Sequence, residues 1–73
     1  MSDTLAPEAR LGNDVARQFG HLPHERAVEQ VAAHLGLFWE RRMRRRLLDL
    51  VDEGADGLDP VLVDAARRLP PEP

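Results

Sequence analysis

Apolar residues recur along this chain at helical spacing, and they nowhere alternate with polar residues as they would in a half-buried strand. Gly and Pro divide the pattern into four segments. It predicts an all-α fold, a small bundle of three to four short helices at about residues 7–19, 24–37, 40–53 and 60–69. Each segment has one apolar face, which would pack against the other segments in a shared core.

The first predicted helix begins at Pro7, because proline suits the first turn of a helix, and Thr4 or Asp3 is its candidate cap. Its apolar stripe recurs every four residues and consists of Leu11, Val15 and Phe19. Gly20 ends this helix, and Leu22 in the following turn is expected to pack inward.

The second and third predicted helices meet at a bend near residues 36–39, where Gly36 weakens the helix. The buried stripe of the second helix is Ala27, Val28, Val31, Ala32 and Leu35. The third helix has one apolar arc, formed by Trp39, Met43, Leu47, Leu50 and Val51. Gly54 follows it at the position of a C-terminal glycine cap.

The fourth predicted helix has the strongest start signal, Asp59 as the cap followed by Pro60 in the first turn. Its apolar face is Leu62, Ala65, Ala66 and Leu69. The predicted organisation is therefore a disordered N-terminus at residues 1–6, a single helical domain at 7–69 and a disordered Pro-rich tail at 70–73.

The chain has 73 residues, so its stability alone is expected to be marginal, and small domains usually compensate with disulfides, a metal or a partner. It has no Cys, and its three His lack a fourth ligand at zinc-site spacing. Two explanations are left: the chain is stabilised by a partner protein, which we favour, or it is a plain helical mini-domain of modest stability. No segment is apolar enough to span a bilayer and the start lacks signal-peptide features, so we expect a cytoplasmic protein without membrane contact.

The most unusual stretch is residues 34–46, which holds the only Trp, one of two Phe and five of ten Arg. Rings beside guanidinium groups are typical of surfaces that dock a partner. The net charge of −3 argues against broad nucleic-acid binding, which depends on neutralising many phosphates. The start of the third helix is basic, which opposes the helix macrodipole, so an acidic partner or a solvated helix face would explain it.

Phe38 and Trp39 are adjacent, so on a helix their rings point about 100° apart. Either both rings belong to the core, or one belongs to the core and the other faces out. His34 lies one turn before Phe38, and we expect it to be buried and hydrogen-bonded rather than a metal ligand. With one Ser, no Cys and no Gly-rich phosphate loop, no independent catalytic or metal site is expected.

The run His34-Leu35-x-x-Phe38-Trp39-x-x-Arg42-Met43-Arg44 resembles the signature of the small delta subunit of NAD-dependent, molybdenum-containing formate dehydrogenases. The flanking segments are similar as well. They are Asn13-Asp-Val15 with Phe19, Leu22-Pro23, and Gly57-Leu58-x-Pro60. The resemblance covers roughly residues 10–69.

This resemblance implies a non-catalytic accessory subunit that docks on the large alpha subunit of a formate dehydrogenase complex. It would assist assembly, stability or insertion of the molybdenum cofactor. The chain itself would bind no cofactor, and the partner complex would carry bis-molybdopterin guanine dinucleotide, iron–sulfur clusters, FMN and NAD. The positions that carry over as partner-binding residues are His34, Phe38, Trp39, Arg42, Met43 and Arg44. In this hypothesis Phe38 or Trp39 is the anchor, and Arg42 and Arg44 pair with carboxylates or transiently with cofactor phosphates.

Two alternatives use the arginine cluster at 41–46 differently. A small helical nucleic-acid binder would show steeply salt-dependent binding. A self-associating regulatory protein would bury the aromatic stripe in a homodimer.

Overall fold

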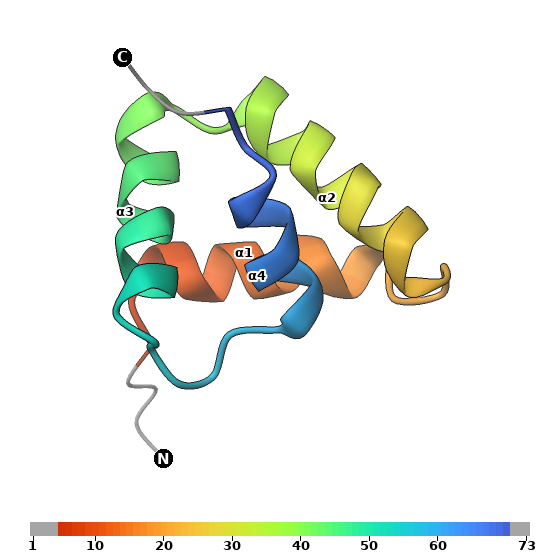
Figure 1. The fold of residues 1–73 in the computed structure, drawn as a ribbon, viewed down its shortest axis with the longest axis horizontal. Helices are drawn as coiled ribbons and strands as arrows, with labels where there is room; N and C mark the ends of the chain where they lie inside the picture. Colours follow the sequence, from red (N-terminus) through yellow and green to blue (C-terminus); the bar gives the residue numbers. More distant parts are fainter. Residues whose placement is uncertain (1–4, 71–73) are drawn as a thin grey trace.

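The computed structural model describes residues 5–70, and in this range the chain forms four helices and no strand (Figure 1). The helices are α1 (Pro7–Gln18), α2 (His24–Phe38), α3 (Arg41–Asp52) and α4 (Pro60–Arg67). The all-α prediction is confirmed, and the predicted boundaries differ from these by at most two residues. The candidate caps Asp3 and Thr4, like the rest of 1–4 and 71–73, lie outside the described residues.

The short helix α4 packs against each of the other three helices (Figure 1). Its inward residues Leu62, Ala65 and Ala66 have no exposed surface. They form one core with residues of the other helices, namely Val15, Ala16, Val28, Val31, Leu35, Trp39, Leu47 and Val51. The predicted faces of α2, α3 and α4 are therefore correct, with Ala32, Met43 and Leu69 at the partly buried edge of this core.

The predicted stripe of α1 is wrong at one position, because Leu11 is 49% exposed. The buried residues of α1 are Ala9, Gly12, Val15 and Ala16, and Phe19 is partly buried. Three of those four are small, so the backbone of α1 approaches α4 closely. The approach is closest at Gly12, where an added Cβ would lie 2.7 Å from a δ-carbon of Leu62.

A side chain of α1 fixes the loop between α3 and α4. Asn13 donates from Nδ2 to the carbonyl oxygen of Gly57 and accepts from the backbone N–H of Asp59, both at 2.8 Å. Gly57 has a φ of +88°, and an added Cβ there would lie 2.7 Å from a δ-carbon of Leu5. Two separate segments of the sequence signature, around Asn13 and around Gly57, are thus parts of one contact.

Both predicted cap signals in the second half of the chain are confirmed. Gly54 has a φ of +72°; its N–H donates to the carbonyl of Val51, and that of Ala55 donates to the carbonyl of Leu50. This pair of bonds is a Schellman motif, which satisfies the last carbonyls of α3. At the start of α4, the Asp59 carboxylate accepts from the Val61 N–H at 2.8 Å.

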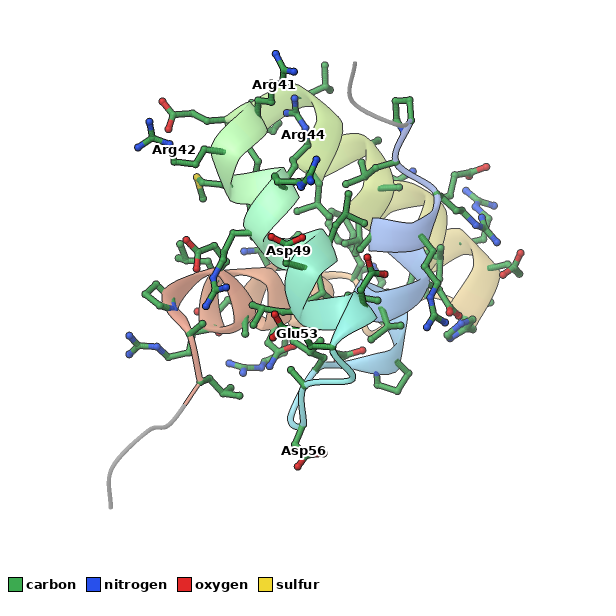
Figure 2. All side chains as sticks on the ribbon, turned by 60° about the vertical axis from the view of Figure 1, so that its left-hand side comes forward. Arg41, Arg42, Arg44, Asp49, Glu53 and Asp56 are labelled. Atoms are coloured by element: carbon green, nitrogen blue, oxygen red, sulfur yellow. The ribbon has the colours of Figure 1, made fainter. Side chains whose placement is uncertain are left out.

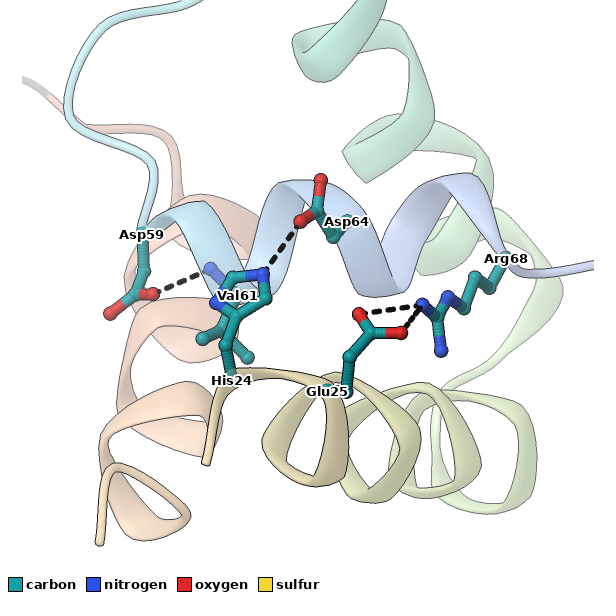
Figure 3. Close-up of polar contacts among 6 residues, drawn as sticks. All are labelled: His24, Glu25, Asp59, Val61, Asp64 and Arg68. Carbon is teal, nitrogen blue, oxygen red and sulfur yellow. Dashed lines mark hydrogen bonds and ion pairs between the residues drawn. The ribbon is translucent and has the colours of Figure 1, made fainter. Parts of the chain in front are cut away.

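Two polar contacts join the start of α2 to α4 (Figure 3). His24 Nε2 lies 2.8 Å from Asp64 Oδ2. Arg68 donates to both carboxylate oxygens of Glu25, at 2.9 and 2.7 Å. The hydrogen bond and charge of Glu25 raise the pKa of Arg68 above its ordinary value, because both stabilise the charged guanidinium.

Candidate functional site

The large exposed apolar residues near the α2–α3 junction are neighbours in the chain. Leu37 is 78% exposed and Phe38 is 72% exposed, at the last two positions of α2. Leu37 points away from the core because it is two residues, about 200° of helix rotation, beyond the buried Leu35. An exposed aromatic ring next to an exposed leucine is the kind of apolar patch that marks a binding surface.

Trp39 is the ring that belongs to the core. It is 8% exposed and is packed in the same cluster as Leu35 and Leu47. Trp39 leaves the helix with an extended backbone, φ −90° and ψ 140°, which turns its side chain inward while Phe38 ends α2 outside. The sequence left two arrangements of these rings open. The one in which both rings belong to the core is wrong, and the one in which one ring is buried and the other faces out is correct.

His34 supports the exposed ring of Phe38. The two rings lie one turn apart on α2, with centroids 4.9 Å apart and planes tilted by 47°. His34 is partly exposed, so the expectation of a buried histidine is wrong. A ring contact of this kind disfavours the rotamers of Phe38 that would break it, which lowers the side-chain entropy lost when the ring is buried by a partner.

Arg44 is held by the backbone at the end of α2. Its Nη1 donates to the carbonyl of Trp39 and lies 3.5 Å from the carbonyl of Leu35. The carbonyl of Leu35 also accepts from the N–H of Trp39, and a guanidinium near the C-terminal end of a helix is favourable because the helix carries partial negative charge there. Arg44 therefore fixes the junction between α2 and α3 and with it the positions of Phe38 and Arg42.

The charges of α3 oppose its macrodipole at both ends. Its first turn contains Arg41 and Arg42 and no acidic residue, and its last turn contains Asp49 and Asp52 and no basic residue. Glu40, at the N-cap, makes no side-chain capping bond. Figure 2 shows the arginines at one end of α3 and Asp49 and Glu53 toward the other. Each misplaced charge costs about 0.3–1 kcal/mol, so folding alone does not favour this order.

The six residues predicted to bind a partner therefore separate by position. Phe38 and Arg42 are exposed, whereas His34, Met43 and Arg44 are half-buried and Trp39 is buried. Sequence reasoning missed Leu37, although its place opposite the buried stripe of α2 was visible in the helical periodicity. We define the junction patch as Leu37, Phe38 and Arg42.

Residues 5–70 contain no group of three His, Asp or Glu side chains placed to bind a metal ion. A shallow depression of about 360 Å³ lies on the outer face of α1, lined by Pro7, Arg10, Leu11 and Asp14. It opens widely to solvent and lies on a different helix from the junction patch. Among the helices of this range, none has the length and apolar content to cross a membrane.

Comparison with known proteins identifies the family. The family described as NADH-dependent formate dehydrogenase delta subunit, FdsD, matches residues 9–66. No curated protein and no solved structure matches the chain. The matched range begins in α1 and ends in α4, so it includes the Asn13 contact, the junction patch and the whole of α3. This chain therefore belongs to the FdsD family, the delta subunits of NADH-dependent formate dehydrogenase.

Proposed function

We propose that this chain is a non-catalytic accessory subunit that docks on the large alpha subunit of a cytoplasmic formate dehydrogenase. There it assists assembly, stability or insertion of the molybdenum cofactor. The observation that carries the proposal is that Phe38 is 72% exposed, while the neighbouring ring, Trp39, is the one that fills the chain's own core. Membership of a family of complex subunits is consistent with a surface that another subunit covers.

Phe38 is the anchor of this docking. Aromatic side chains supply much of the binding energy at interfaces, and burying a phenylalanine ring is worth about 1.5–3 kcal/mol. Leu37 extends the apolar area beside it, and the contact with His34 limits the motion of the ring. Trp39, the other ring of the signature, is buried in the core, so its contribution to docking is to fix the position of the α2–α3 junction.

Arg42 is the charged partner of the anchor. It is exposed on the first turn of α3, where a guanidinium can form a bidentate pair with a carboxylate of the large subunit. Arg44 acts as a positioning residue, since its guanidinium bonds the carbonyl oxygens at the end of α2. Of the two arginines expected to pair with partner carboxylates or cofactor phosphates, we therefore assign the pairing to Arg42.

The redox cofactors of the complex belong, in this proposal, to the partner subunits. Bis-molybdopterin guanine dinucleotide, iron–sulfur clusters, FMN and NAD would be bound there, and the delta chain would act on the large subunit before or during cofactor loading. Nucleic-acid binding through 41–46 is not favoured, because the acidic residues of α3 and its C-terminal loop would repel phosphates.

The test replaces the native chain in cells by single variants and measures the molybdenum content and activity of the purified formate dehydrogenase. Phe38→Ala and Arg42→Ala are expected to lower both. Leu11→Ala is the matched control, since Leu11 is also an exposed apolar residue but lies on α1. Full molybdenum content and activity with Phe38→Ala protein present at the wild-type level would refute docking through the junction patch.

A further inference from the structure

The outer face of α3, together with its C-cap residue Glu53, carries two triads of opposite charge with the same spacing. The basic triad is Arg42, Arg45 and Arg46, and the acidic triad is Asp49, Asp52 and Glu53. In each triad the three residues occupy positions i, i+3 and i+4, which share one face of a helix. The acidic triad repeats the basic triad seven residues later, which is two helical turns or about 10 Å along the axis.

This face is charged and open to solvent. Five of its six side chains belong to exposed residues, and the sixth, Asp49, is 48% exposed. Within the face, Arg45 and Asp49 form an ion pair of 3.6 Å that bridges the two triads. Interfaces that close stable homodimers are mostly apolar in their core, and this face has no apolar residue. The triads are therefore suited to orient a partner that is anchored elsewhere rather than to bind it unaided.

The order of the two triads specifies the partner. In an ordinary helix, carboxylates are favoured near the N-terminus and basic residues near the C-terminus. In α3 the order is reversed, so an ordinary helix complements it only when the two run parallel. In the antiparallel direction, basic residues would face basic residues. Complementary charge of this kind sets orientation and suppresses wrong pairings more than it adds affinity.

We propose that the outer face of α3 sets the orientation of docking by accepting a surface helix of the large subunit that runs parallel to α3. That helix has carboxylates in its first turns and Lys or Arg in its last turns. The inference rests on the proposed function, because the junction patch supplies the anchor only three residues before α3 begins. The alternative occupant is a second copy packed antiparallel, since the face would then complement itself.

The first experiment exchanges the two triads, with Arg42, Arg45 and Arg46→Glu and Asp49, Asp52 and Glu53→Arg. Net charge is unchanged, because three residues of each sign are replaced. The tagged exchanged chain is co-expressed with the large subunit, and we expect it to capture at least about tenfold less large subunit than the wild-type chain does. The melting temperature of the exchanged chain should not fall below that of the wild type. The control is Arg26→Glu with Glu29→Arg, which exchanges an exposed ion pair on α2 and should leave capture unchanged.

The outcomes separate this inference from the proposed function. Wild-type capture by the exchanged chain, together with lost capture by Phe38→Ala, overturns the role of α3 and leaves the anchor intact. Wild-type capture by both variants overturns both proposals. Because the six-residue exchange also replaces Arg42 of the junction patch, Arg46→Glu with Glu53→Arg is measured beside it. This variant exchanges a single pair and leaves Arg42 in place, and about a threefold loss of capture is expected. Wild-type capture by this variant would overturn the role of the triads even if the six-residue exchange abolishes capture, and the same variant serves if the six-residue chain does not fold.

The second experiment uses the lack of lysine in this chain. Carbodiimide joins carboxylates to amines, so Asp52 and Glu53 can be cross-linked only to an amine of another protein or to a chain's own amino terminus. We expect cross-links from these residues to lysines in the last turns of a large-subunit helix whose first turns carry carboxylates. Cross-links to lysines at the start of a helix, or none, would overturn the parallel arrangement. Salt-sensitive dimerisation of the isolated wild-type chain in sedimentation, without heterodimers when it is mixed with the exchanged variant, would overturn it in favour of a second copy.

Discussion

Gly12 and Gly36 lie inside helices, and the same substitution at the two positions should change stability in opposite directions. At Gly12, an alanine Cβ would lie 2.7 and 2.9 Å from the two δ-carbons of Leu62 and 3.3 Å from its γ-carbon. At Gly36, nothing lies within 4 Å of an added Cβ. The pair therefore isolates the packing of α1 on α4 from the general preference of helices for alanine.

The magnitude follows from two terms. Alanine is favoured over glycine in a helix by about 1 kcal/mol, and this gain applies at both sites. At Gly12 the extra methyl overpacks the core, which typically costs about 1–3 kcal/mol. Leu62 has no exposed surface, so its side chain has no solvent to move into, and we take a cost near the upper end. Gly12→Ala should therefore lose about 1–2 kcal/mol, and Gly36→Ala should gain about 0.5–1 kcal/mol.

Chemical denaturation followed by far-UV circular dichroism and by Trp39 fluorescence measures both changes. In a domain of this size, 1 kcal/mol shifts the melting temperature by about 4–8 °C, so the melting temperatures of the two variants should differ by roughly 6–24 °C. Equal or greater stability of Gly12→Ala relative to Gly36→Ala would refute the close contact between α1 and Leu62.

Three further predictions concern the folded chain. Asn13→Ala removes two hydrogen bonds of 2.8 Å to the α3–α4 loop and should lower the free energy of unfolding by about 1–2 kcal/mol. A decrease below about 0.3 kcal/mol would show that the loop keeps its conformation without these bonds. Trp39→Ala should lower the free energy of unfolding by about 3–5 kcal/mol, whereas Phe38→Ala should change it by less than about 0.5 kcal/mol. Similar losses of stability in the two variants would contradict the assignment of Trp39 to the core and Phe38 to the surface. Exchange of the two charged triads of α3 should stabilise the chain by roughly 1 kcal/mol at low salt and less at high salt, and a loss of stability would show that the reversed charge order favours folding.

Much of the fold was predictable because its signals are local. Asp59-Pro60 starts a helix and Gly54 ends one through the chemistry of the neighbouring backbone, so a short window of sequence contains the whole cause. The apolar arcs of α2 and α3 were equally accessible from periodicity. The error at Leu11 had a tertiary origin, since α1 packs with small residues at close approach and leaves this larger one at the edge.

The candidate site was predictable as a segment but not in its detail. The motif pointed to residues 34–44, yet helical spacing alone places Phe38 near the buried face of α2. It is exposed because the helix ends there and Trp39 turns into the core instead. The bond from Arg44 to the end of α2 and the contact between Asn13 and Gly57 depend on how separate helices meet, which no local pattern contains.

The most direct test of the account is the affinity of the purified chain for the purified large subunit, measured by titration calorimetry for the wild type and for Phe38→Ala. Removal of a central aromatic anchor commonly costs 2 kcal/mol or more, which is roughly a 30-fold rise in Kd. We expect a rise of this size in the Kd of Phe38→Ala, with the fold of the variant intact by circular dichroism. An unchanged Kd for the folded Phe38→Ala variant, or no binding by the wild type, would contradict docking through the junction patch.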